Sequence, residues 1–463
     1  MRQGPLYWEY MAKNIVRYVC TNCGAVTSAW AGRCSQCSEW NTLQEEVTLV
    51  EPAGLGGKKQ REPGRAISTQ NITEAVKHQE KRLPTAIGDI DTVLGGGLVM
   101  GGVVLIAGQP GIGKSTLLMQ IAHHIATKSN VLYVSGEESE HQVGLRAKRL
   151  GATATKLKIA NATVSDDIAA TMHGGEFDLV VVDSIQTMTT NGVSTAPGSV
   201  SQITNSTTAL LTAAKQSNTA LIIVGHVTKE GTIAGPKLLE HIVDVVLQLE
   251  GDAYGGFKIL RAVKNRFGPT SEAAILEMRE TGLEPVLNPS EALLEERQIT
   301  DGSIVLATVE GTRPLLVEVQ ALVNKTDFGY PKRAASGIDL NRVNLLIAML
   351  ERRTKLNLSD KDIYINIVGG IRLSDPAADL AICMAIASAA KGMQLKKNAV
   401  VFGEVGLSGE VRYVPLIERR VAEAEKLGFD VAVGPRIRGN SVQPKFLHSV
   451  TDIRSALNTY LEK

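Results

Sequence analysis

The sequence predicts an α/β protein in which a small four-cysteine unit precedes two larger α/β units. Three observations predict this fold class. Short apolar runs alternate with segments of helical periodicity, as in sheets covered by helices. A glycine-rich sequence directly follows one apolar run, and two closely spaced cysteine pairs stand near the N-terminus. The length of 463 residues allows two or three domains.

The two cysteine pairs, Cys20 with Cys23 and Cys34 with Cys37, form two C-x-x-C units. In a reducing cytoplasm this spacing favours a metal site over a disulfide framework. Four thiolates from two turns complete a tetrahedral Zn²⁺ site without an open position, so we expect a structural zinc ribbon. A redox dithiol or unrelated thiols are the alternatives. Cys383 lies in an apolar helical run and is expected to be a core thiol.

The glycine-rich sequence at residues 108–115 fits G-x-x-x-x-G-K-[ST], the phosphate-binding loop of P-loop NTPases. An apolar run at 103–107 precedes it and a helical pattern follows, so its backbone N–H groups would face phosphate oxygens at a helix N-terminus. Lys114 would reach the β- and γ-phosphates, and Ser115 would bind Mg²⁺. A chance glycine turn is the alternative. The predicted ATP-binding residues here are Gly108, Gln109, Pro110, Gly111, Ile112, Gly113, Lys114, Ser115 and Thr116.

Two later apolar segments, each a predicted strand, lead to carboxylate side chains. Asp183 closes an apolar run in the Walker B pattern and is expected to hold Mg²⁺ through water beside Ser115. Glu137 follows another predicted strand, where the ligand crevice of an open α/β sheet lies, and is our candidate for polarising the attacking water. The alternative is that Ser139 caps the next helix while Glu137 and Glu138 face solvent.

Further expected elements surround these residues. We expect strands at 131–135, 157–160, 178–183 and 220–224, then an antiparallel meander at 243–250, 257–263 and 273–278. His226 could sense the γ-phosphate or make a structural hydrogen bond. Lys264 and Arg266, in Lys-Asn-Arg-Phe-Gly at the end of a meander strand, suit phosphate contacts to a neighbouring subunit's ATP. A solvated turn is the alternative for this motif.

The chain is expected to comprise a tail and ribbon (1–40), a linker (41–80), a P-loop domain (81–287) and a second α/β domain (288–463). The composition limits the possible partners. The chain has 49 Lys and Arg against 48 Asp and Glu, so a nucleic-acid site must come from local patches or rings of subunits. We see no membrane-spanning run and no signal peptide, and therefore expect a cytoplasmic protein without a membrane partner.

The order of zinc ribbon, RecA-like P-loop core, Lys-Asn-Arg-Phe-Gly motif and C-terminal α/β block resembles the bacterial DNA repair family called RadA or Sms. The resemblance covers essentially the whole chain after Met11. It implies a DNA-dependent ATPase that binds single-stranded DNA, forms a hexameric ring and acts with the RecA recombinase. Such a protein promotes branch migration of recombination intermediates.

By this resemblance, Lys114, Ser115 and Asp183 take the ATP and Mg²⁺ roles, and Glu137 is the catalytic base. Lys264 and Arg266 take part in the nucleotide and DNA response. The alternative function is an ATP-controlled assembly switch or scaffold without motor activity.

Residues 369–381 resemble the nucleophile turn of the Lon protease, but Ala377 stands where Lon has its serine. Glu418 is expected at the position of Lon's lysine. Without a hydroxyl nucleophile and its amine base, acyl transfer is excluded, which disfavours an ATP-dependent protease. We expect a scaffold for ring assembly, with a DNA-binding face or a merely solvated surface formed by basic residues. These are Lys332, Arg333, Arg342, Arg352, Arg353 and Lys355.

Overall fold

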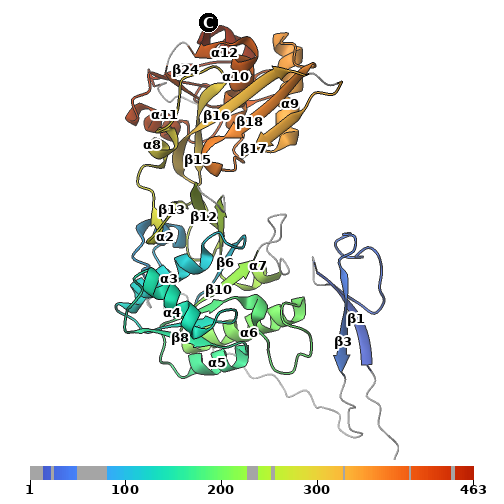
Figure 1. Ribbon diagram of the computed structural model, residues 1–463, viewed down its shortest axis with the longest axis vertical. Coiled ribbons are helices and arrows are strands. Elements are labelled where there is room, and N and C mark those ends of the chain that lie inside the picture. Colours follow the sequence, from blue (N-terminus) through green and yellow to red (C-terminus); the bar gives the residue numbers. More distant parts are fainter. Residues whose placement is uncertain are drawn as a thin grey trace, which may run out of the picture. The chain divides into compact units, whose positions relative to one another are not determined.

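The computed structural model describes residues 14–21, 25–49, 81–226, 238–251, 256–326, 329–395, 398–438 and 444–462. The chain divides into two compact units, Met1–Leu247 with Val263–Gly268, and Gln248–Ala262 with Pro269–Lys463. Within the described ranges, no helix is long and apolar enough to cross a membrane. The predicted α/β class is confirmed, and Figure 1 shows its helices and strands.

The N-terminal ribbon is a three-stranded antiparallel sheet of order β2-β1-β3. Its strands are β1 (Asn14–Cys20), β2 (Val26–Thr27) and β3 (Leu43–Leu49). All seven residues of β1 pair with β3, from Asn14 opposite Leu49 to Cys20 opposite Leu43. The predicted linker start at residue 41 is therefore wrong, because β3 closes the ribbon. The sequence signal for β3 was weak, because its apolar residues Leu43, Val47 and Leu49 are interrupted by polar ones.

The P-loop core is built on the parallel part of a nine-stranded sheet, in the order β6-β10-β9-β7-β8. Its apolar side chains alternate between the two faces, and Leu105, Val134 and Val182 share one buried cluster with helices α5 and α6. The expected strands are confirmed within two residues at each end. The strands are β6 (Val103–Gly108), β7 (Val131–Ser135), β8 (Leu157–Asn161), β9 (Leu179–Asp183) and β10 (Ala220–His226). The helices are α3 (Lys114–Ala126), α4 (Glu140–Arg149), α5 (Ser165–His173) and α6 (Val200–Ser217).

The sheet continues through β11 (Val245–Gly251), β12 (Phe257–Asn265), β13 (Ala273–Arg279) and β14 (Gly282–Pro285). Strands β12 and β13 pair antiparallel, as expected for the last two runs of the meander, and β14, which the sequence analysis did not name, pairs antiparallel with β13. Phe257, Ile259 and Ile275 belong to the apolar core of the second compact unit. That unit thus begins earlier in the chain than the boundary at residue 288 that the sequence suggested.

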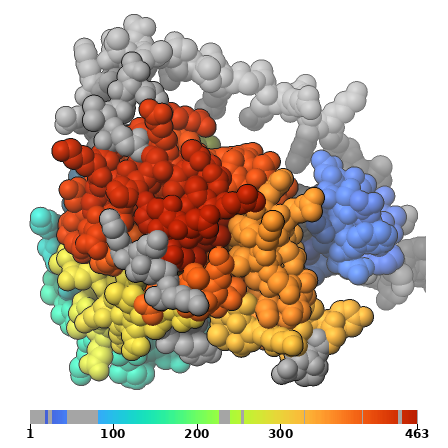
Figure 2. All heavy atoms as spheres, turned by 90° about the horizontal axis from the view of Figure 1, so that it is seen from above, coloured from blue at the N-terminus to red at the C-terminus, as the bar shows by residue number. Residues whose placement is uncertain are grey.

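The second unit is dominated by a seven-stranded sheet of order β17-β18-β16-β15-β20-β23-β24. Helix α10 is buried along nearly its whole length, because its residues are small or apolar on every side. In Figure 2 the residues after 300, coloured orange to red, form one continuous surface toward the viewer. The strands are β15 (Ser303–Glu310), β16 (Arg313–Lys325), β17 (Arg333–Ser336), β18 (Lys361–Ile367), β20 (Ala399–Val401), β23 (Val431–Gly434) and β24 (Leu447–Ser449). The helices are α8 (Pro289–Leu294), α9 (Leu340–Thr354), α10 (Ala378–Lys391), α11 (Ile417–Lys426) and α12 (Ile453–Tyr460).

Candidate nucleotide-binding site and metal centre

The phosphate-binding loop connects a fully buried strand to a helix N-terminus. Strand β6 ends at Gly108 and α3 begins at Lys114, as the motif predicts. Gly111 (φ 77°) and Gly113 (φ 110°) adopt left-handed backbone conformations that only glycine adopts without strain. The loop can therefore turn its N–H groups toward an anion at the positive end of the α3 dipole.

Lys114 is buried, and its ammonium lies inside the loop. Its Nζ donates to the carbonyl oxygens of Gly108 (2.9 Å) and Gln109 (3.0 Å). Burial lowers the pKa of Lys114, and the negative charges of Asp183 and Glu137 partly oppose that change. The structure thus brings three of the predicted site residues, from three different segments, into one electrostatic neighbourhood.

The two carboxylates come from the ends of adjacent parallel strands, β7 and β9. Ser135 lies opposite Asp183 in the register, and Glu137 follows two residues later. The hydroxyl of Tyr133 donates to Asp183 Oδ2 at 2.6 Å, and that of Ser184 donates to Glu137 Oε1 at 2.5 Å. Burial, reinforced by the charge of Asp183, raises the pKa of Tyr133 well above its ordinary value, so it remains a donor.

Gly136 allows the two strand ends to come close together. A Cβ at this position would lie 2.1 Å from Thr187 Oγ1 and 2.8 Å from Met188 Cε. Its N–H donates to the Asp183 carbonyl at 2.9 Å, which ties the two chain segments at the site. A side chain here would therefore displace Glu137 from the neighbourhood of Asp183.

Glu137 and Glu138 have different surroundings. Glu138 forms an ion pair with Arg146 of α4, and its backbone N–H donates to Ser135 Oγ at 2.9 Å. Glu137 is exposed and bonded to Ser184. Ser139 does cap α4 in a capping box with Gln142, so that part of the alternative interpretation is confirmed. The geometry nevertheless separates the two glutamates and leaves Glu137 facing the site.

His226 ends β10, where its Cα is paired in register with Gly108 of the phosphate-binding loop. The backbone position agrees with a residue near the γ-phosphate. The side chain of His226 and the segment 227–237 lie outside the described residues.

The Lys-Asn-Arg-Phe-Gly motif divides its two cations between different tasks. Lys264 Nζ donates to the carbonyl oxygens of Glu240 (2.6 Å), His241 (3.3 Å) and Val243 (2.8 Å), at the end of α7 (Leu238–Ile242). Burial, and then the charge of Arg266, lowers the pKa of Lys264. Arg266 is 53% exposed, and its Nη1 forms an ion pair with Asp244 Oδ1 at 3.2 Å. Within one chain, therefore, Lys264 holds a helix end and Arg266 faces outward.

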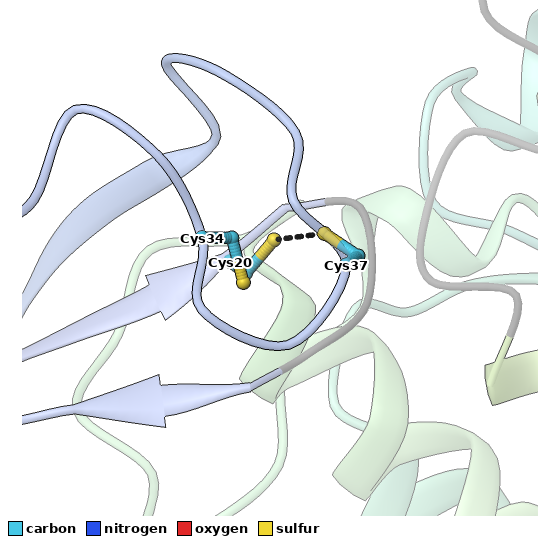
Figure 3. A group of neighbouring side chains, drawn as sticks. All are labelled: Cys20, Cys34 and Cys37. Carbon is cyan, nitrogen blue, oxygen red and sulfur yellow. Dashed lines mark hydrogen bonds between the residues drawn. The ribbon is translucent and has the colours of Figure 1, made fainter.

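Three of the four predicted zinc ligands converge in the ribbon. The Sγ atoms of Cys20, Cys34 and Cys37 lie within 4.8 Å of one another, as Figure 3 shows, and those of Cys20 and Cys37 are 3.6 Å apart. Tetrahedral Zn–S bonds of about 2.3 Å require sulfur separations of roughly 3.8 Å. The thiolate set therefore fits Zn²⁺. Cys23 lies outside the described residues.

The C-terminal unit carries no protease dyad at the expected turn. Ala377 precedes α10 with its side chain buried, which agrees with the missing nucleophile. Glu418, which we expect at the position of Lon's lysine, is exposed in the first turn of α11. Arg420, one helical half-turn later, is fully buried and forms an ion pair with Asp375 at 2.8 Å. A guanidinium that keeps its proton cannot serve as a general base.

Sequence reasoning missed the partners that hold these groups. Tyr133 stands between apolar residues of a buried strand, where a phenolic hydroxyl usually requires a hydrogen-bond partner. Ser184 directly follows the Walker B carboxylate. The sequence does not indicate that Arg420 is buried, because a charged residue on a helix usually faces solvent.

Family comparisons match three parts of the chain. The family described as a rubredoxin metal binding domain matches residues 18–45, an AAA domain matches 73–232, and the ChlI subunit of Mg-chelatase matches 338–437. With the geometry above, these matches define the class: a zinc ribbon, an ATP-binding AAA domain and a ChlI-like α/β domain.

Several curated proteins match nearly the whole chain. The DNA repair protein RadA of Bacillus subtilis is 46% identical and covers 97% of this chain and 100% of its own length. The protein of the same name from Pseudomonas aeruginosa is 44% identical, with 98% and 100% covered, and that from Aquifex aeolicus is 42% identical, with 96% and 99% covered. The chain belongs to the RadA family, which confirms the resemblance found in the sequence.

Proposed function

We propose that this chain is a DNA-dependent ATPase that binds single-stranded DNA and promotes branch migration of recombination intermediates during DNA repair. It acts with the RecA recombinase in the cytoplasm and assembles as a hexameric ring. The printed name of its relatives, DNA repair protein, supports the setting. The observation that carries the ATPase proposal is the meeting of Lys114, Asp183 and Glu137 beside one phosphate-binding loop.

The loop and its lysine bind the triphosphate. When ATP enters, the Lys114 ammonium, which donates to the Gly108 and Gln109 carbonyls, turns to the β- and γ-phosphate oxygens. Ser115 and Asp183 supply the oxygen ligands that Mg²⁺ prefers, directly or through water. A Mg²⁺ ion held by these two residues would supply positive charge to offset that of the phosphates.

Glu137 positions and deprotonates the attacking water. It is exposed on the side where the strands end, whereas Glu138 is occupied by Arg146. Ser184 holds one carboxylate oxygen, Oε1, and so orients the carboxylate. A positioned base of this kind typically contributes about 10²–10⁴ in rate.

Ring assembly gives the remaining predicted residues their roles. Arg266, which is half-exposed, reaches the ATP of a neighbouring subunit and stabilises charge in the transition state. Lys264 acts indirectly by holding the end of α7. His226, beside the start of the phosphate-binding loop in the sheet, senses the γ-phosphate. A ring also reconciles DNA binding with a net charge of +1, because a few cations in each subunit multiply around a central channel.

The test measures ATP hydrolysis with and without single-stranded DNA, together with the assembly mass. We expect stimulation by DNA that weakens steeply with salt, and a hexameric mass. Lys114→Ala abolishes hydrolysis and retains the fold and zinc. Lys148→Ala, on the exposed face of α4, is the matched control and keeps full activity.

Each failure has a distinct meaning. Hydrolysis that DNA does not stimulate contradicts the motor and supports an ATP-controlled assembly switch. Full hydrolysis by Lys114→Ala contradicts the assignment of the phosphate-binding loop itself.

A further inference from the structure

Two buried hydroxyls connect strands β7 and β9 reciprocally at the candidate site. Tyr133 of β7 donates to the carboxylate that ends β9, and Ser184, just after β9, donates to the carboxylate that follows β7. Each segment thus supplies one acid and one hydroxyl that holds the other segment's acid. We call these two hydrogen bonds the hydroxyl brace.

Because both hydroxyls of the brace are buried, each keeps its carboxylate as its acceptor. Tyr133 is 1% exposed and Ser184 is fully buried, so neither hydroxyl can exchange its acceptor freely for bulk water. The other four residues of β7 are buried as well, and phenylalanine would fill the same space as Tyr133. Packing therefore does not explain the phenolic oxygen, whereas its 2.6 Å bond to Asp183 does.

The two bonds constrain different acids. Asp183 is 9% exposed and receives Tyr133 on Oδ2, which leaves Oδ1 for a metal-bound water. Glu137 is exposed and accepts the Ser184 hydroxyl on Oε1, which ties its carboxylate to the end of β9. Hydrogen bonds to the outer side of such carboxylates orient them toward a metal or a substrate.

We propose that Tyr133 and Ser184 are positioning residues for nucleotide hydrolysis: Tyr133 fixes Asp183 for the magnesium–nucleotide complex, and Ser184 fixes Glu137 for the attacking water. The proposal rests on the proposed ATPase function. It predicts that the two hydroxyls, although they belong to one brace, control two separable quantities. Tyr133 controls how strongly Mg²⁺ tightens nucleotide binding, and Ser184 controls the rate of hydrolysis.

The first arm measures binding of a fluorescent ADP to the full-length chain, in Mg²⁺ and in EDTA. Tyr133→Phe is expected to reduce the tightening by Mg²⁺ about 10–100-fold and to leave affinity in EDTA unchanged. Tyr460→Phe is the matched control. It removes a hydroxyl that bonds to His448 in the other compact unit, and both affinities stay as in the original chain. Melting temperatures of both variants check that each has folded.

The second arm measures hydrolysis. Ser184→Ala is expected to lower the maximal rate at least tenfold, with affinity for the fluorescent ADP unchanged in Mg²⁺. In a Glu137→Gln background the same change adds no further loss, because it acts only through Glu137. Equal losses in both backgrounds would mean that Ser184 acts independently of Glu137.

The outcomes separate the brace from the proposed function. If the original chain hydrolyses ATP and Tyr133→Phe keeps its full response to Mg²⁺, the brace is wrong and the ATPase stands. If the original chain binds ADP with Mg²⁺ and does not hydrolyse ATP, the proposed function fails. The binding arm still decides the role of Tyr133 in that case.

Discussion

Neutralising Asp375 should open the C-terminal unit locally, because it leaves a buried guanidinium without its counter-charge. Arg420 has no exposed surface, and its Nη2 lies 2.8 Å from Asp375 Oδ2. Nη1 donates to the Ala307 carbonyl at 2.6 Å, and the guanidinium lies 5.9 Å from the centre of the Phe402 ring. Burial lowers the pKa of Arg420 and Asp375 opposes this change, but a guanidinium stays charged at neutral pH.

The magnitude follows from this burial. Removing one partner of a buried ion pair costs about 3–5 kcal/mol. The neutral partners of Arg420 survive in Asp375→Asn, so we expect a value near the lower limit, about 3 kcal/mol. Since about 1.4 kcal/mol corresponds to a tenfold change, local opening should become roughly a hundredfold more frequent.

Native-state hydrogen exchange of the full-length chain measures this opening directly. Arg420 belongs to α11, and Asp375, just before α10, accepts from the Thr308 hydroxyl of β15 at 3.1 Å. Backbone amides of β15 and α11 should therefore exchange about a hundredfold faster in Asp375→Asn, and those of β9 should not change. Arg412→Gln is the control, because that ion pair with Glu410 is exposed and contributes little. Unchanged exchange in β15 and α11 would refute the view that the pair holds these elements together.

Three further predictions follow from other parts of the chain. Cys34→Ser should release zinc, measured by metal analysis, and increase protease cleavage before residue 50 without changing nucleotide affinity; full zinc retention would contradict the thiolate site. Ala377→Ser should yield no peptide cleavage, because Arg420 cannot act as the base; turnover of a casein substrate would refute this. Burial raises the pKa of Glu310 above its ordinary value near 4.5, and Arg261 opposes the shift. The folded state therefore holds its proton more tightly, and the free energy of unfolding should fall as pH rises from about 4.5 through the raised pKa. Glu310→Gln should remove this decline in urea unfolding, and an unchanged pH dependence would count against it.

Much of the fold was predictable from the sequence because local patterns dominate there. The β6 strand, its glycine turn and α3 follow from apolar periodicity and from backbone conformations that only glycine adopts easily. The meander at β12 and β13 was equally clear from its runs and turns. The end of the ribbon was not, since β3 is defined by pairing with β1, a contact between residues far apart in sequence.

The residue types of the site were predictable from the sequence, but the hydrogen bonds and ion pairs between them were less so. The positions of Asp183 and Glu137 follow from the rule that strand ends meet at one edge of a parallel sheet. The sequence favoured Glu137 over Glu138 by position alone, whereas the ion pair of Glu138 with Arg146 depends on the orientation of α4. Arg420 was missed for a similar reason. Only the packing of α11 against β15 shows that this charge points inward.

The central claim is that Glu137 activates the water that attacks ATP. Single-turnover hydrolysis, with single-stranded DNA present, tests it through two matched variants, Glu137→Gln and Glu138→Gln. We predict that Glu137→Gln slows hydrolysis about 10²–10⁴-fold with nucleotide binding retained, and that Glu138→Gln changes the rate only a few-fold. A large loss confined to Glu138→Gln, or full activity in Glu137→Gln, would contradict the claim.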